Sequence, residues 1–222
     1  MKRLNGFWLN PTRNRCYFVE IMDNPVMLNY LADVLASFRN YKSLADKSFA
    51  QVSDAEFFRS IDAEANSIAA ITKHLAGNFR SRWTDFLTSD GEKPNRHRDL
   101  EFVTLENETR QNLLESWENG WMILLAAVES LAPEDLSKTV TIRNEEHTVI
   151  EALNRALSHC AYHVGQIILL AKHFRSNDWQ TLSVPRNKSQ EFNAFVKTRT
   201  EETSERLDRF GALQEFNAKL QS

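Results

Sequence analysis

Residues 148–174 constrain the fold most, because they read as one long amphipathic helix. Thr148 and Glu151 have the spacing of a capping box, so the start of this helix is well marked. Apolar residues then recur every three or four positions and form a stripe that faces a core, namely Val149, Leu153, Ala156, Cys160, Val164, Ile167 and Ala171.

Three other segments show the same periodicity, at residues 25–49, about 65–87 and about 105–131. Pro25 suits the first turn of the first segment, and Pro133 ends the third. The chain has only six glycines and five prolines, which argues against an all-β fold with its many turns. Four long amphipathic segments predict an all-α four-helix bundle, in which ligand and metal sites form between facing helices.

The rest of the chain surrounds one predicted bundle domain at residues 22–199. Residues 1–21 are expected to be an irregular extension, and the true start stays open between Met1 and Met22. Residues 200–222 are expected to be a tail with a short helix. Within the domain we expect a polar connection after residue 52, a short extended piece at 139–142 that leads into a turn, and an irregular aromatic segment at 176–197 that wraps the bundle.

Charge and composition exclude several classes of function. A net charge of −3 gives no reason to expect nucleic acid or an anionic membrane as a partner. The sequence holds neither an apolar run long enough to span a membrane nor a secretory signal, so we expect a cytoplasmic protein. Two cysteines are too few for a disulfide framework, and Cys160 lies on the core stripe.

Three histidines stand out as candidate metal ligands. His159 and His163 are four residues apart on the fourth segment, where β-carbons lie about 5–6 Å apart, so both imidazoles can reach one ion. His74 is the one large side chain in a strip of small residues on the second segment. Gly77 in that strip serves either close helix packing or space for a bound group. Ordinary core or surface histidines remain the alternative interpretation, because a lone pair at this spacing is a weak motif.

Three imidazoles from two packed helices would leave metal positions open, which is typical of catalytic rather than structural sites. Neutral ligands leave the charge of the ion undiminished and favour deprotonation of a bound water or thiol. Zinc, nickel, iron and manganese all suit such ligands. His97 stands between two arginines and His147 is expected to be exposed, so neither is counted as a ligand.

Four stretches resemble the DinB/YfiT-like superfamily, and more narrowly a branch labelled a domain of unknown function. They lie around His74, at Ser81 to Pro94, around His159 and His163, and at Leu182 to Asn193, and the resemblance covers about residues 24–197. It implies an up-down-down-up bundle, a homodimer, and a divalent metal, most often nickel or zinc, at His74, His159 and His163. Better-studied relatives are transferases and isomerases that use bacillithiol, mycothiol or glutathione.

Four polar residues are weighed as substrate-binding or supporting groups. Gln166 could contact a substrate or a water, and Asn78 could orient an imidazole; half-exposed or packing roles are the alternatives. Arg82 and Arg155 could bind a substrate carboxylate bidentately, or form surface ion pairs. Tyr162 is expected to serve packing. Trp83, Trp117 and Trp121 are expected in the core or a dimer interface.

Two hypotheses about function follow. The first is a metal-dependent thiol S-transferase or isomerase, with a hydrolase as a variant. The second is a non-catalytic, stress- or damage-linked homodimer in which the metal stabilises the bundle or senses a ligand. The sequence shows no obvious acid or base carboxylate beside the three histidines, which weakens the hydrolase variant.

Overall fold

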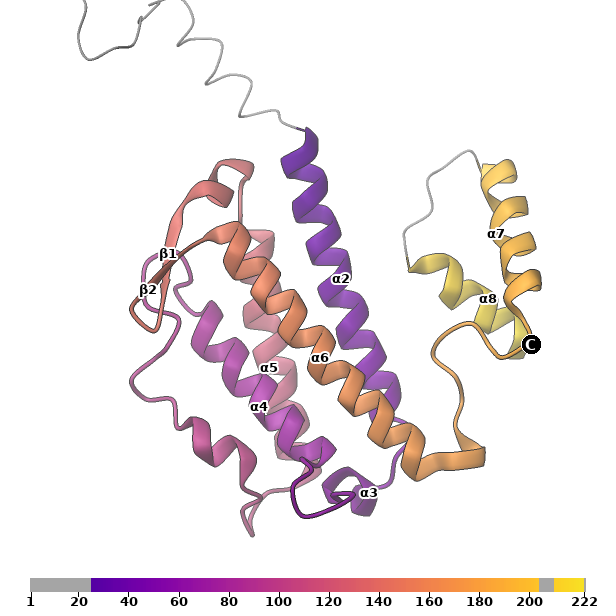
Figure 1. Ribbon diagram of the computed structural model, residues 1–222, viewed down its shortest axis with the longest axis horizontal. Coiled ribbons are helices and arrows are strands. Elements are labelled where there is room, and N and C mark those ends of the chain that lie inside the picture. The colour runs from indigo at the N-terminus through magenta and orange to yellow at the C-terminus, as the bar shows by residue number, and fades with distance from the viewer. Residues whose placement is uncertain (1–24, 204–209, 222) are drawn as a thin grey trace, which may run out of the picture.

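The computed structural model describes residues 25–203 and 210–221, and it is a bundle of four long helices (Figure 1). The bundle helices are α2 (Pro25–Phe49), α4 (Ile68–Trp83), α5 (Arg110–Glu129) and α6 (Val149–Arg175). This confirms the predicted all-α fold with terminal extensions. The expected extension at residues 1–21 lies outside the described residues.

The direction of each helix follows from the contacts at its ends. Tyr30 near the start of α2 donates to Asn154 near the start of α6, so these two helices run the same way. Arg110 at the start of α5 donates to the carbonyl of Phe49 at the end of α2, so α5 runs the opposite way. Helix α4 packs closely beside α5 and runs parallel to it, which gives the up-down-down-up arrangement (Figure 1).

An aromatic core holds the four helices together. Phe38, Phe79, Trp117 and Trp121 are almost fully buried, and their rings meet edge to face or tilted at centroid distances of 4.6–6.3 Å. Such pairs contribute about 0.5–1.5 kcal/mol each beyond the area they bury. Helices α4 and α5 approach so closely that a β-carbon at Gly120 would lie 3.0 Å from the Cα of Ala76. Because of this packing, α4 is fixed in position along most of its length.

Local signals place α6 where the sequence predicts it. The Thr148 backbone N–H donates to the Glu151 carboxylate at 2.7 Å, and the Glu151 N–H donates to the Thr148 hydroxyl at 3.2 Å. The capping box is therefore complete, and the helix continues to Arg175. The first residue of the helical run, Val149, is fully buried.

A two-stranded hairpin precedes α6, where only an extended piece and a turn were expected. Strand β1 (Thr139–Ile142) pairs antiparallel with β2 (Glu145–Thr148). Arg143 and Asn144 form the two-residue turn, both with positive φ (57° and 61°), which matches the right-handed twist of hairpin strands. The hairpin is joined to the loop that follows α4, because the Gly91 N–H donates to the Thr141 carbonyl at 2.8 Å.

Several boundaries differ from the sequence-based expectations. Helix α4 begins after the cap Ser67 and ends before Thr84, and α5 begins after the cap Thr109, so both are shorter than the apolar periodicity indicates. The connection after α2 contains the short helix α3 (Asp54–Phe58), which Ser53 caps.

Further short elements lie outside the bundle helices in the described part of the chain. These are the short 3-10 helices η1 (Arg98–Phe102), η2 (Pro133–Ser137) and η3 (Ser176–Asp178), and α7 (Ser189–Thr203), which replaces part of the expected irregular segment. The helix α8 (Gly211–Gln221) packs against α7 beside the bundle (Figure 1). No helix within residues 25–203 and 210–221 combines the length and apolarity needed to cross a lipid bilayer.

Candidate metal centre

The three predicted histidines meet between α4 and α6. One ring nitrogen from each of His74, His159 and His163 lies within 4.8 Å of the other two. The Nε2 atoms of His74 and His159 are 3.1 Å apart. Two imidazole nitrogens that bind one zinc ion tetrahedrally at 2.0–2.1 Å lie about 3.3 Å apart. The three side chains could therefore hold a divalent metal ion.

Two of these imidazoles are oriented by a hydrogen-bond partner on Nδ1, the ring nitrogen that points away from the other histidines. The Nδ1 of His74 lies 2.8 Å from Oε2 of Glu101, and a carboxylate only accepts, so Nδ1 carries the proton and Nε2 keeps its lone pair. The Nδ1 of His163 lies 2.9 Å from Oε1 of Gln166, which leaves its Nε2 free in the same way. Metal-binding histidines usually have such a partner on the second ring nitrogen. The donor set therefore fits a metal ion.

Glu101 is the residue that the sequence did not reveal. It lies on η1, 27 positions from His74, and only 7% of it is exposed. Arg96 binds it with two hydrogen bonds, at 2.8 Å to Oε1 and 2.9 Å to Oε2. Burial alone would raise the pKa of this carboxyl, but hydrogen bonds from His74 and Arg96 outweigh burial, and the pKa is lowered. Glu101 is thus a buried, ionised group held between a cation and an imidazole.

Gly77 now has a structural reason. A β-carbon at this position would lie 2.9 Å from Cδ of Glu101 and closer still to its Oε1. The glycine therefore leaves the space that the carboxylate occupies beside His74, one turn away on α4. Neither of the two alternatives from the sequence, close packing of helices or space for a bound group, describes this role.

Burial keeps two of the imidazoles neutral. Desolvation, together with the smaller effects of His163 and His74 as potential cations, lowers the pKa of His159 to about 3. Desolvation and then His74 lower the pKa of His163 to about 4, against the hydrogen bond to Gln166. Neutral imidazole is the form that binds metal. Cys160, by contrast, faces the core, and burial raises the pKa of its thiol, so it is not a ligand.

A cavity of about 510 Å³ opens onto the histidines between α4, α6, the hairpin and η1. Asn78, Arg82 and Arg155, which were singled out from the sequence, all line it, whereas Gln166 only supports His163 from behind. Tyr162 also lines it and packs against the His163 ring at a centroid distance of 4.7 Å, so it lies beside the histidines and not away from them. The remaining lining residues are Asn66, Trp83, Phe86, Arg96, Arg98, Phe102, Ile142, Arg143, Ala152 and Ala156.

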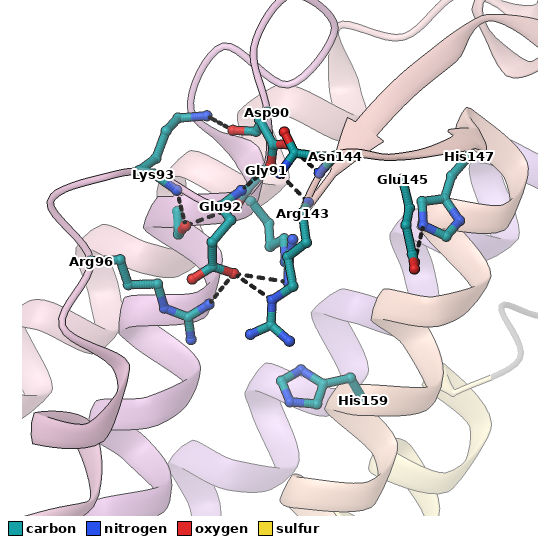
Figure 2. A network of polar contacts seen from close by, with 12 residues as sticks. Asp90, Gly91, Glu92, Lys93, Arg96, Arg143, Asn144, Glu145, His147 and His159 are labelled. Carbon is teal, nitrogen blue, oxygen red and sulfur yellow. Dashed lines mark hydrogen bonds and ion pairs between the residues drawn. The ribbon is translucent and has the colours of Figure 1, made fainter.

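A loop between α4 and η1 forms the roof of this cavity (Figure 2). Asp90 in the loop accepts hydrogen bonds from the backbone N–H groups of Arg143 (2.9 Å) and Asn144 (2.8 Å), which fixes the hairpin turn to the loop. Ser81 on α4 donates to the Gly91 carbonyl at 2.8 Å and anchors the loop from below. These contacts bring the Arg143 side chain over His159 (Figure 2).

The other histidines lie elsewhere. His97 precedes η1 and is exposed, in agreement with its exclusion as a ligand. His147 lies on β2 and is half-buried rather than exposed, with its Nε2 4.0 Å from the carboxylate of Glu145 (Figure 2).

Comparison with known proteins gives one match. A family model described as "Protein of unknown function (DUF1572)" matches residues 26–188, which include all four bundle helices and the three histidines. No curated protein and no solved structure matches the chain.

Proposed function

We propose that this chain, which belongs to the DUF1572 family, is a metal-dependent enzyme that transfers or isomerises a substrate with the help of a low-molecular-weight thiol. The observation that carries the proposal is the donor set: three converging imidazoles, two of them oriented from behind, at the floor of a cavity. A divalent ion there would supply an open position that lowers the pKa of a thiol or water. We propose nickel or zinc, with iron or manganese as other candidates.

The surrounding residues have distinct parts in this proposal. Glu101 and Gln166 hold His74 and His163 in the required tautomers. The cavity between Asn78, Ala152 and Ala156 gives room for the thiol and the electrophile beside the histidines. In the reaction, the thiol loses its proton to solvent, its sulfur attacks an electrophilic carbon, and the leaving group departs with the bonding electron pair.

Glu101 also bears on the hydrolase variant. Its two oxygens already accept hydrogen bonds from His74 and from two nitrogens of Arg96, so it is not free to take a proton from water. A general base has to reach the proton that it removes. A thiol at neutral pH needs less help to ionise than water does, which favours the thiol-dependent reaction.

The sequence resemblance to the DinB/YfiT-like superfamily supports the same proposal, since its three histidine positions are filled by His74, His159 and His163. A non-catalytic protein in which the metal stabilises the bundle or senses a ligand is the second candidate. The half-buried cavity with a basic and aromatic lining favours the enzyme over this candidate, because a purely structural metal needs no such space.

Turnover with a generic electrophile tests the proposal. Nickel- or zinc-loaded protein is incubated with glutathione, cysteine or another small thiol and with chlorodinitrobenzene, and loss of thiol is followed. We expect consumption that stops with a chelator and in His159→Ala, and continues in His97→Ala. Stoichiometric metal binding without turnover by any thiol would instead assign the protein to the non-catalytic class.

A further inference from the structure

The cavity above the histidines is strongly cationic. Its lining contains five arginines, Arg82, Arg96, Arg98, Arg143 and Arg155, and no aspartate or glutamate from the described residues. The chain as a whole carries more acidic than basic residues, 30 against 27. The positive lining is therefore a local feature of this cavity and not a consequence of composition.

The acidic residues nearby do not neutralise these arginines. A single carboxylate oxygen of Glu92 forms ion pairs with three of them, at 3.3 Å from Arg82, 3.6 Å from Arg96 and 3.0 Å from Arg143 (Figure 2). Glu101 is engaged by Arg96 from below. Two carboxylates thus face five guanidinium groups, and a bound divalent ion would increase the imbalance.

Two arginines retain unused donors. Arg155 lies one turn before His159 on α6 and forms no hydrogen bond or ion pair with any residue in the described part of the chain. The side chain of Arg82 is only 12% exposed, and its Nη1 is buried without a partner among the same residues. A buried donor without an acceptor is unfavourable by itself, so a bound acceptor would stabilise it.

The electrostatics of Arg82 point the same way. Burial lowers the pKa of its guanidinium to about 10, and repulsion from Arg96, Arg143 and Arg155 adds to that effect against the attraction of Glu92. An anion bound among these cations would stabilise the charged form of the Arg82 guanidinium. The planar fork of arginine matches a carboxylate, which it binds with two parallel hydrogen bonds.

The same cavity has an apolar side. Trp83, Phe86, Phe102 and Tyr162 line it together with the arginines. Trp83 and Phe86 form one ring pair at a centroid distance of 4.5 Å. The Phe102 ring stacks on the His74 ring at a centroid distance of 4.8 Å, beside the candidate metal position. A ligand that satisfies both sides has an acid group and an apolar or aromatic body.

We propose that the substrate of this site is a small organic carboxylate with an unsaturated or aromatic body. Its carboxylate binds Arg82 and Arg155, and its body packs against the aromatic side, so that the remaining end faces the histidines. This inference rests on the proposed function in that it names the substrate class of the same site, but carboxylate binding itself requires no turnover.

A matched pair of probes tests the charge directly. Binding of cinnamate and of uncharged cinnamamide to the full chain is measured by calorimetry, with zinc bound and after chelation, without any thiol. We expect cinnamate to bind at least about tenfold more tightly, since a bidentate charged pair is lost in the amide. Equal affinities, or tighter binding of inorganic phosphate than of cinnamate, would overturn the carboxylate assignment.

Variants locate the binding group. Arg155→Gln and Arg82→Gln should each weaken cinnamate about tenfold or more and leave cinnamamide within about twofold. Arg80→Gln removes an exposed arginine of α4 that does not line the cavity, and it should leave both affinities unchanged. Circular dichroism confirms that each variant is folded. An equal loss in Arg80→Gln, or no loss in Arg155→Gln, which is exposed and safe for folding, contradicts the proposal.

The two proposals fail separately. If cinnamate binds as expected and no thiol is consumed in any condition, the proposed function is wrong and the carboxylate site stands. If thiol is consumed in a metal-dependent manner while cinnamate and cinnamamide bind alike, the enzyme stands and the carboxylate inference is wrong.

Discussion

Glu101 is the residue through which the metal proposal can be tested without removing a ligand. Glu101→Gln keeps the shape of the side chain but removes the charge that holds the Nδ1 proton of His74. We expect the affinity for zinc or nickel to fall about 10–100-fold, the usual effect of losing such a supporting partner.

The measurement is a titration of metal-free protein with a competing chelator. Glu106→Gln, in the exposed segment after η1, is the matched control and should bind metal like the original chain. An unchanged affinity in Glu101→Gln would mean that Glu101 does not support a ligand. We expect His74→Ala to lower the metal affinity more than Glu101→Gln does, because His74→Ala removes a ligand itself.

The candidate site could be predicted from the sequence only where it lies on regular helices. His159 and His163 share one helix, so their relative position follows from the helical repeat. His74 is marked by its small neighbours. Glu101 has no such signal, because it lies in a charged segment where its partners Arg96 and His74 are found only through the tertiary fold. The space left by Gly77 was the indirect sign that a group approaches α4 at this point.

Helix α4 carries a second prediction, at Gly77. Alanine is favoured over glycine inside a helix by about 0.8–1.0 kcal/mol, but the new methyl group would collide with the Glu101 carboxylate. We therefore expect Gly77→Ala to weaken metal binding about tenfold or more by displacing the partner of His74. Gly165→Ala is the control on α6, since nothing lies within 4 Å of its β-carbon position.

The comparison separates helix propensity from the collision. At a protein concentration low enough to keep the chain monomeric, Gly165→Ala should raise the free energy of unfolding by up to about 1 kcal/mol and leave metal affinity unchanged. Chemical denaturation and metal titration on both variants provide the measurements. If Gly77→Ala behaved like Gly165→Ala in both measurements, the Glu101 carboxylate would have room to move and the explanation for Gly77 would be wrong.

The loop between α4 and η1 gives a prediction about pH. Hydrogen bonds from the backbone N–H groups of Glu92, Asn144 and Arg143 lower the pKa of Asp90. A carboxyl whose pKa is lower in the folded state stabilises the fold above its unfolded pKa of about 3.9, and that contribution is lost as pH falls through the folded value. Asp90→Asn should therefore destabilise the protein most near neutral pH.

The expected pattern is a difference in stability between the two proteins that shrinks below about pH 4, measured by urea denaturation across a pH series. Asp99→Asn, at an exposed position in η1, should show no such difference. If the difference in the free energy of unfolding stayed constant with pH, the asparagine would destabilise the fold for steric reasons and the charge of Asp90 would not be involved.

For the molecule as a whole, the bundle was predictable because each long helix carries its own apolar stripe and marked ends. The hairpin and α7 were not. Strand β2 reads as a polar segment, and Arg143 and Asn144 give a weak turn signal. Helix α7 has only a partly buried face, which packs on α8, so its apolar periodicity is weak. The domain division at residues 22–199 remains a prediction.

The homodimer also remains a prediction, and the structure changes its basis. Trp83, Trp117 and Trp121 are buried in the core, so they no longer argue for an interface. Helix α6 instead presents Tyr162 (62% exposed) and Leu169 (66% exposed) on one side, with Gly165 between them. A symmetric contact between copies would bury both of these exposed apolar side chains at once. We therefore expect the chain to form a dimer in solution through this side of α6.

Leu169→Glu tests this expectation, because an interface that buries a carboxylate without a partner is strongly disfavoured. Light scattering at micromolar concentration should report a dimer for the original chain and a monomer for Leu169→Glu. Met122→Glu, which changes an equally exposed apolar residue on α5, should remain dimeric. A monomer in the original chain would remove the homodimer altogether, whereas a monomer only in Met122→Glu would move the interface to α5. Because Tyr162 also lines the cavity, loss of the dimer should change cinnamate binding if the partner closes that side of the site.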